Sequence, residues 1–218
     1  MNRIIFIGLL LFIGSNVFSQ KVDTNNTSVY QSDPYEVKTL FGRNHKIGGY
    51  GAFSFGFAQT NKRNTLLAGG RGGVIIGQHL TLGLAGQGFS TDYNQSSSST
   101  GTNYFQVNGG YGGLLIEPII LPRFPIHLSF PLVLGAGGVG SYNSYYDTTN
   151  EYWRDELIDD DLFFVVEPGV ELEFNLTRFF RLSFGAYYRY TTAIALNGFD
   201  KNLLEGLSAN IVFKFGKF

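Results

Sequence analysis

Five charged side chains between Glu167 and Arg189 lie an even number of residues apart, and these are the residues of the sequence best suited to chemistry. Glu167, Glu171 and Glu173 precede a short polar stretch, and Arg181 and Arg189 follow it. In an extended chain, residues two apart lie on the same face, so these carboxylates and guanidinium groups share one face. Buried charges must be paired and hydrogen-bonded. This pattern therefore predicts either a network of ion pairs or the lining of a path for ions.

The residues between these charges are apolar and occupy the opposite face. They are Phe164, Val166, Pro168, Val170, Leu172 and Phe174 before the polar stretch, and Phe180, Leu182, Phe184, Ala186, Tyr188 and Tyr190 after it. Strict period two, repeated on both sides of Leu176–Arg178, is typical of a β-hairpin. A charge-free face opposite a charged one is typical of a transmembrane β-barrel, in which lipid-facing and interior-facing residues alternate.

Composition agrees with short alternating strands rather than with membrane helices. Charged residues make up 15% of the 218 residues and hydrophobic residues 44%, against about 25% charged in soluble domains. Glycine (29 residues) and aromatic residues (16%) are abundant, as in a thin barrel wall with aromatic girdles. The net charge of −1 gives no indication of nucleic-acid binding. Without cysteine, disulfides and thiolate metal sites are excluded, and the three scattered histidines do not indicate a metal site.

The N-terminal region is predicted to be an export signal followed by a polar lead. Arg3 and the apolar run Ile4–Ile13, followed by small residues up to Ser19, indicate a signal peptide over 1–19 that is cleaved before Gln20. Residues 20–45 are predicted to form a periplasmic lead, and residues 46–218 the barrel. The signal peptide together with the alternating apolar segments predicts a location in the outer membrane of a Gram-negative cell.

Eight alternating segments follow Lys46, which predicts an all-β, antiparallel, up-and-down transmembrane barrel. Short connections alternate with longer ones near 59–65, 90–103, 140–161 and 193–206. Because bacterial barrels keep short turns in the periplasm, both termini are expected there. In segment Tyr104–Ile119 the parity is irregular, because Phe105 would point inward if Glu117 is an interior residue, and we expect a β-bulge in Gly109–Gly113. A soluble lipocalin-like barrel is the alternative, but two of the segments have no charge for a water-facing surface.

The predicted interior charges come from four of these segments. They are Arg71, Glu167, Glu171, Glu173, Arg181, Arg189 and Lys214. An eight-stranded barrel is just wide enough for side chains to fill. A salt-bridged interior is the favoured interpretation, and a narrow passive pore for small solutes or ions is the alternative.

The chain resembles the small eight-stranded outer-membrane proteins of the OmpA/OmpX-like class, of a type found in Bacteroidota. The resemblance is carried by the signal peptide, the eight alternating segments and the C-terminal segment Asn210–Phe218. It implies outer-membrane lipid as surroundings and recognition of the terminal aromatics Phe213, Phe215 and Phe218 by the barrel-assembly machinery. Phe218 has the opposite parity to the other two. Members of this class have adhesive, anchoring, pore-forming and lipid-modifying roles, so the class alone does not select one.

His127-Leu128-Ser129 resembles the His-x-Ser pair of outer-membrane lipid A deacylases, which are small barrels that act on lipid. Those enzymes place the pair facing lipid near the outer leaflet, with an acidic residue following. Here the pair follows a short turn with interior parity, and the rest of that segment has no Asp or Glu. We therefore interpret His127 as an interior histidine and predict no catalytic residue, cofactor or metal.

The connection Gly140–Asp161 is predicted to be the longest surface loop and the best candidate for binding a surface partner. It combines aromatic and acidic residues, namely Tyr142, Tyr145, Tyr146, Tyr152, Trp153, Asp155 and Glu156. Aromatic side chains presented by a rigid scaffold are common in binding sites. A solvated loop without a partner is the alternative.

Overall fold

The computed structural model describes residues 47–60, 63–98, 101–147 and 152–218, with side chains described for 47–59, 64–91, 106–143 and 155–218. The predicted signal peptide and lead lie outside these residues. The strands are β1 (Ile47–Thr60), β2 (Arg63–Ile76), β3 (Leu80–Ser98), β4 (Gly101–Ile120), β5 (Ile126–Ser129), β6 (Leu132–Asp147), β7 (Tyr152–Asn175), β8 (Phe180–Thr191) and β9 (Gly206–Lys217). Among the described residues, no helix is long and apolar enough to cross a membrane.

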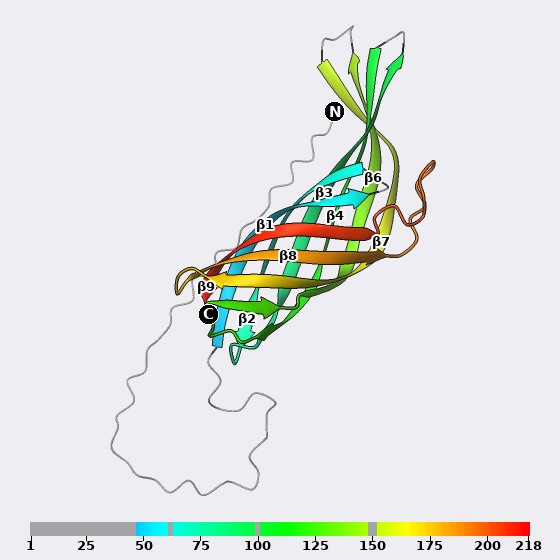
Figure 1. The fold of residues 1–218 in the computed structure, drawn as a ribbon. Coiled ribbons are helices and arrows are strands. Elements are labelled where there is room, and N and C mark those ends of the chain that lie inside the picture. The colour runs from blue at the N-terminus through cyan, green and yellow to red at the C-terminus, as the bar shows by residue number, and fades with distance from the viewer. Residues whose placement is uncertain (1–46, 61–62, 99–100, 148–151) are drawn as a thin grey trace, which may run out of the picture. The chain divides into compact units, whose positions relative to one another are not determined.

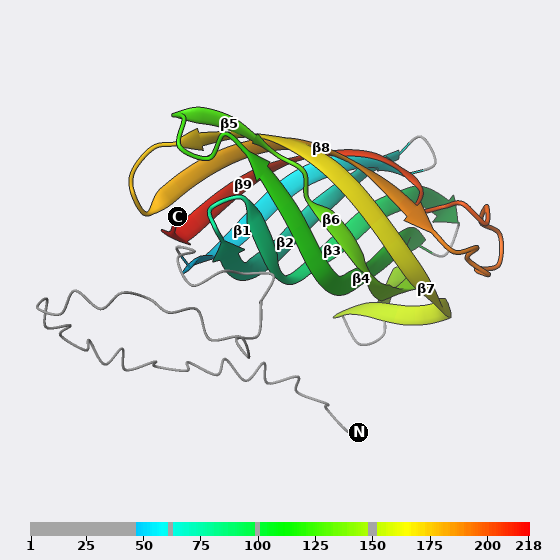
Figure 2. The same cartoon turned by 90° about the horizontal axis from the view of Figure 1, so that it is seen from below.

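All pairings are antiparallel: consecutive strands pair from β1 to β4 and from β7 to β9, β5 and β6 each pair with both β4 and β7, and β9 returns to pair with β1 (Figure 1). Register runs from Gly49 opposite Lys217 to Ala58 opposite Ser208, so the first and last strands close the sheet into a ring. Figure 2 shows this ring from below, with β1 beside β9. The described residues form nine strands, and β5 and β6 occupy one position, which leaves eight positions around the ring. The structure confirms the predicted all-β, eight-stranded barrel.

Proline explains why one position is split into β5 and β6. Pro131 separates the two strands and has no N–H to donate to its neighbours. The carbonyl of Pro131 still accepts a hydrogen bond of 2.8 Å from Gly169 N, and Phe130 N donates one of 2.9 Å to Pro118 O. The wall is therefore continuous at this level although the ladder is irregular.

Apolar side chains cover the outside of the ring, as the alternation predicted. On β7, Leu162 is 79% exposed and Phe164 71%, whereas Phe163 and Val165, which alternate with them, are buried. The outer faces of β1 and β9 carry stacked aromatic rings, with the Phe53 and Phe213 centroids 5.0 Å apart. A surface of this kind is stable in lipid, because hydrocarbon surrounds the apolar side chains and the closed ladder pairs the backbone groups.

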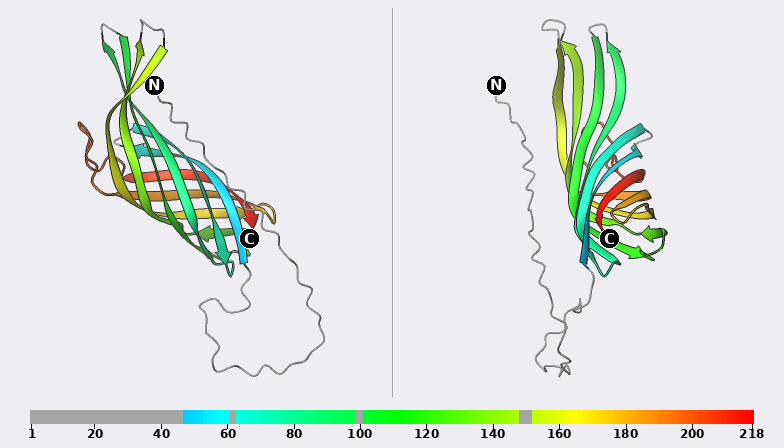
Figure 3. Two further views of the ribbon diagram at one scale, coloured as in Figure 1. Left: turned by 180° about the vertical axis from the view of Figure 1, so that it is seen from behind. Right: turned by 90° about the vertical axis from the view of Figure 1, so that its left-hand side faces the viewer.

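Two of the predicted loops are wrong, because strands continue through them. β3 and β4 pair up to Ser98 opposite Gly101, and β6 and β7 pair up to Asp147 opposite Tyr152. These two long hairpins extend beyond the other strands in Figure 3. The alternation is lost there because both faces of a hairpin outside the bilayer meet water. The hydrogen-bonded ladder needs no apolar face, so it persists where the sequence pattern ends.

The predicted β-bulge in Gly109–Gly113 is also wrong. Pairing of β4 with β3 is continuous from Pro118 to Phe105, and the register shift lies on β3, between Tyr93 and Gln95. The bulge was expected because the interior was assumed to be polar throughout. In the structure Val107 and Tyr111 point inward with Glu117, because the interior near the long hairpins is apolar.

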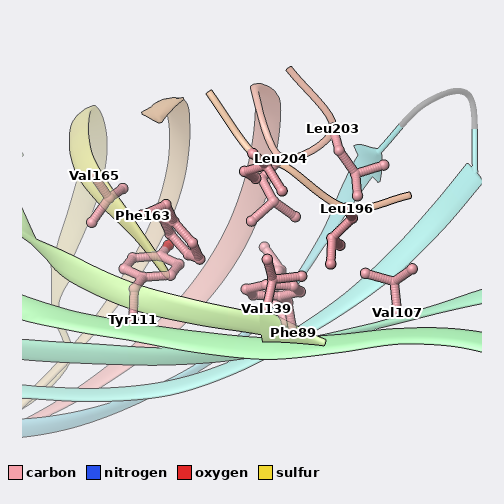
Figure 4. Packing of buried hydrophobic residues seen from close by; sticks show 11 residues of the cluster. Phe89, Val107, Tyr111, Val139, Phe163, Val165, Leu196, Leu203 and Leu204 are labelled. Atoms are coloured by element: carbon pink, nitrogen blue, oxygen red, sulfur yellow. The ribbon is translucent and has the colours of Figure 1, made fainter. Parts of the chain in front are cut away.

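The segment between β8 and β9 supplies much of that apolar interior. Its residues Ile194, Leu196, Leu203 and Leu204 are buried in one cluster with Leu67, Phe89, Val107, Tyr111, Val139, Phe163 and Val165 of the strands. Figure 4 shows Leu196, Leu203 and Leu204 facing the strand side chains. We call residues 192–205 the inner segment. It fills the barrel at the long-hairpin end, which its mixed composition did not predict.

Candidate functional site

The charged residues predicted for the interior all lie on the inner face of the ring. Glu171 and Glu173 are fully buried, and Lys214 and Arg189 are only 1% and 2% exposed. They are positioned by period two on β7, β8 and β9, where the alternate residues face lipid. The ring brings together charges that are far apart in the sequence.

Lys214 lies at the centre of the lower interior, nearer the short turns. Its Nζ is 2.7 Å from Glu117 Oε1 and 3.0 Å from Glu171 Oε2, and it also contacts Glu173. One oxygen of each carboxylate lies within 4.8 Å of the other two, a spacing that could hold a metal ion. The ammonium group takes the central position, so the lysine supplies the positive charge that these three carboxylates require.

Arg71 and two tyrosines complete this cluster. Arg71 Nη2 lies 2.6 Å from Glu171 and 3.4 Å from Glu117. Tyr50 donates a hydrogen bond of 2.5 Å to Glu117 Oε2, and the Tyr187 hydroxyl donates one to Glu171. Each carboxylate therefore has several donors, which offsets the cost of burying its charge.

His127 and Ser129 lie in the same cluster, beside Glu173. His127 Nε2 is 3.0 Å from Glu173 Oε2, and Ser129 Oγ donates a hydrogen bond of 2.6 Å to Glu173 Oε1. A catalytic serine would direct its proton to the imidazole. Here the hydroxyl and the imidazole both contact the same carboxylate, so the arrangement supports the Glu173 charge and forms no nucleophile–base pair.

A second group of charges lies higher in the barrel, below the apolar cluster. Arg189 Nε is 3.4 Å from Glu167 Oε2, and the Tyr111 hydroxyl donates to the same carboxylate. The Arg189 guanidinium also lies 4.7 Å from the centre of the Tyr111 ring. A cavity of about 30 Å³ lined by Arg71, Glu167 and Tyr187 lies between the two groups. That volume is enough for about two water molecules.

The interior charges balance in sign. Among the described side chains, the carboxylates of Glu117, Glu167, Glu171 and Glu173 face the cations Arg71, Arg181, Arg189 and Lys214, which is four of each. Paired charges at these distances hold the walls of the barrel together. They do not leave an open row of one sign, which an ion-selective path would use.

Sequence reasoning missed several members of this site. Glu117 was recognised as an interior residue but not as part of the network, and the roles of Tyr50, Tyr111 and Tyr187 were not foreseen. Parity could have placed Tyr187 inside together with Glu117, since both alternate with apolar residues, whereas Tyr50 and Tyr111 have glycine on both sides and give no such signal. Their partners could not be assigned, because register around the ring determines which side chains meet.

The predicted surface-binding loop is a hairpin, and its acidic residues have different surroundings. Asp155 and Glu156 are exposed on β7. The side chains of Tyr145, Tyr146, Tyr152 and Trp153 lie outside the described side chains, and Tyr142 is half-buried. Asp161 accepts a hydrogen bond of 2.7 Å from Ala195 N, and Asp159 accepts one of 2.9 Å from Asn197 N. Part of the acidic run therefore holds the inner segment in place.

The C-terminal aromatics lie on both faces of β9. Phe213 and Phe215 stack on the outside, where Phe215 lies 4.8 Å from the ring of Phe180. Phe218 is on the inner side, with its ring centre 3.9 Å from the Arg181 guanidinium. The opposite parity of Phe218 thus gives it a contact at the short-turn mouth of the barrel.

The closed ring, its apolar outer face and its filled interior define the class as an eight-stranded transmembrane β-barrel, the fold of small outer-membrane proteins. No protein family model matches the chain, and a comparison with curated proteins found no similar sequence.

Among solved structures, the chain is similar to Ail, the attachment invasion locus protein of Yersinia pestis. The two share 11% identity with a TM-score of 0.39, over 78% of this chain and 96% of Ail. It is also similar to Neisserial surface protein A (NspA), with 13% identity and a TM-score of 0.42, over 80% of this chain and 99% of NspA. At such low similarity, the class rests on the strand order and surface of this barrel.

We predict that Lys214→Met strongly destabilises the barrel. Without the ammonium group, three buried carboxylates face one another, and the loss of one partner of a buried ion pair costs about 3–5 kcal/mol. The free energy of unfolding can be measured by urea titration in lipid vesicles, with gel mobility reporting the folded fraction. Lys201→Met, which removes an exposed lysine of the inner segment, is the matched control. Equal urea midpoints for the two variants would contradict a stabilising network.

Proposed function

We propose that this protein is an integral outer-membrane β-barrel with a structural or surface-interaction role and an interior closed by ion pairs. The observation that carries the proposal is the filling of the barrel in successive layers. The ion-paired cluster around Lys214, the Glu167–Arg189 pair and the apolar cluster with the inner segment follow one another along its interior. Such an interior supports a scaffold and opposes steady conduction.

The outer surface and the polarity of the connections support insertion in the outer membrane. Apolar side chains face outward around the ring, and the short turns gather at one end while the long hairpins extend from the other. We assign the short-turn end, with both chain termini, to the periplasm and the long hairpins to the cell surface. Export would use the N-terminal signal peptide, and assembly would use the C-terminal aromatic strand.

We expect the protein to fractionate with outer membranes and to remain there after carbonate extraction. Because a closed ring resists SDS until it is heated, boiled and unboiled samples should migrate differently in gels. Replacement of the outward residues Phe53 and Phe164 with Asp should impair insertion, since charge on the lipid face costs free energy at each site. Recovery of the parent protein as a soluble periplasmic species would disprove the membrane placement.

The alternative function, a narrow pore, can be distinguished from a closed barrel by its ion conductance. The parent protein in planar bilayers should show no steady current, because the interior charges are paired and the cavity between them has room for only about two water molecules. A reproducible ion-selective current that changes in the Glu171→Gln variant would contradict the proposal of a closed interior and would favour a pore. A known porin reconstituted in the same bilayers serves as the positive control.

The long hairpins are the part of the barrel best placed to meet a surface partner. They extend past β8 and β9, and the β6–β7 hairpin combines exposed acidic residues such as Asp155 with an aromatic-rich sequence. Loops and hairpins on a rigid scaffold often carry binding. No described group in this region or in the interior forms a nucleophile–base pair, so we favour interaction over catalysis.

Shortening the β6–β7 hairpin should abolish binding to a surface partner without impairing assembly. Residues 144–155 can be replaced by Asn-Gly, so that Asn143 and Glu156, which pair in the structure, flank a two-residue turn. This design keeps Asp159 and Asp161, which hold the inner segment. The matched control shortens the β3–β4 hairpin in the same way, with residues 93–105 replaced by Asn-Gly so that the paired residues Asp92 and Gln106 flank the turn. Chemical crosslinking on cells should detect partners of the parent and the control only, and identical crosslinks from all three proteins would exclude this hairpin as the binding site.

A further inference from the structure

A pocket at the short-turn mouth gathers positive charge from four parts of the chain. Its volume is about 590 Å³, within the range of small-molecule sites. Arg123 comes from the β4–β5 turn, Arg178 from the β7–β8 turn, Arg181 from β8 and Lys217 from the end of β9. In Figure 1 these turns lie at the same end of the barrel as the C-terminus. No carboxylate side chain is among the described residues that line this pocket.

These cations differ from those deeper in the interior, because carboxylates do not neutralise most of them. Arg123, Arg178 and Lys217 are exposed and form no ion pair with a described carboxylate. Arg123 Nε donates to the neutral side chain of Gln78 at 3.3 Å. Positive charges that share a concave mouth with a low-dielectric wall raise the local potential for anions.

Arg181 forms the inner wall of this pocket and is built into the barrel. It is 5% exposed, and one face of its guanidinium stacks on the Phe218 ring. Its Nη1 lies 3.4 Å from Glu173, whereas its buried Nε has no hydrogen-bond partner among the described residues. The fixed guanidinium therefore places a positive charge at the inner wall of the pocket, where it attracts an oxyanion.

The ends of the barrel also differ in the sign of their exposed charge. The long-hairpin end exposes Asp155, Glu156, Asp160 and Asp200 among the described side chains, with Lys201 as its described cation. The short-turn end exposes Arg123, Arg178 and Lys217. An anion is therefore attracted to the short-turn mouth and repelled from the opposite end.

We propose that the short-turn mouth is a binding site for a phosphate-bearing anion. Three arginines favour this chemistry, because the planar guanidinium matches the oxygens of a phosphate group with two parallel hydrogen bonds. A soluble phosphate ester and the headgroup of an anionic phospholipid both carry that group. The ion-paired cluster behind Arg181 closes the site on its inner side, so the anion binds at the mouth and is not conducted.

Pyrophosphate is the probe, titrated by calorimetry into the full-length protein in an uncharged detergent at low salt. We expect saturable binding that weakens as salt increases. Arg178→Gln combined with Lys217→Gln should weaken pyrophosphate binding about a hundredfold, since each lost charge-assisted hydrogen bond removes about a factor of ten. Lys201→Gln, at the opposite end, is the matched control and should bind like the parent. Heat-dependent gel mobility verifies that all variants are folded.

Two lipid compositions distinguish the sources of the phosphate group. In nanodiscs of zwitterionic lipid, pyrophosphate should bind as it does in detergent. If pyrophosphate binding decreases as the phosphatidylglycerol content of the nanodiscs increases, the lipid headgroup competes for the site and is its ligand. If pyrophosphate binding is unchanged, the ligand is a soluble phosphate ester. Absence of saturable binding to the parent, or equal affinity in the folded double variant and the parent, overturns the proposal.

Discussion

Closure of the sheet by β1 and β9 is the constraint on which the rest of the structure depends. In hydrocarbon an unpaired backbone group costs several kcal/mol, so a sheet can span a membrane only if it has no free edge. The ten residue pairs from Gly49–Lys217 to Ala58–Ser208 join the two ends of the chain's strand series. Because β1 and β9 carry Phe53, Phe213 and Phe215 outward, the same contact also contributes aromatic packing to the lipid-facing side.

A closed ring of eight positions leaves a narrow interior, and this chain fills it in two chemically different ways. Toward the short turns, Lys214 and Arg71 pair with glutamates that tyrosine hydroxyls also bind. Toward the long hairpins, Leu203 and Leu204 of the inner segment belong to one buried apolar cluster with Phe89 and Val107. Buried ion pairs need complete sets of partners, whereas apolar packing needs only volume. The apolar part can therefore be built from a connection, while the ionic part is built from paired strands.

The long-hairpin end also shows how a polar sequence can support an apolar core. Asp161 and Asp159 of β7 accept hydrogen bonds from the backbone N–H groups of Ala195 and Asn197, which lie outside the strands. Thr192 N donates to Phe164 O at 3.1 Å, so the wall beside the short β8 is continued by the inner segment. Backbone groups that leave a sheet still require partners. The acidic run thus has a structural role in addition to the surface role we propose for its exposed members.

The sequence by itself determined the fold class, because strict alternation of apolar and polar residues is imposed by the lipid on one side of each strand. It also determined which charges point inward, such as Glu171 on β7 and Lys214 on β9, since parity is a local property of the strand. Only the tertiary structure decided that Lys214 meets Glu117, 97 residues away in the chain, because such a contact depends on the register summed around the ring. Likewise, the extent of the long hairpins and the burial of Leu203 and Leu204 were decided by pairing and packing, which leave no periodic signal where both faces are wet or where a connection folds inward.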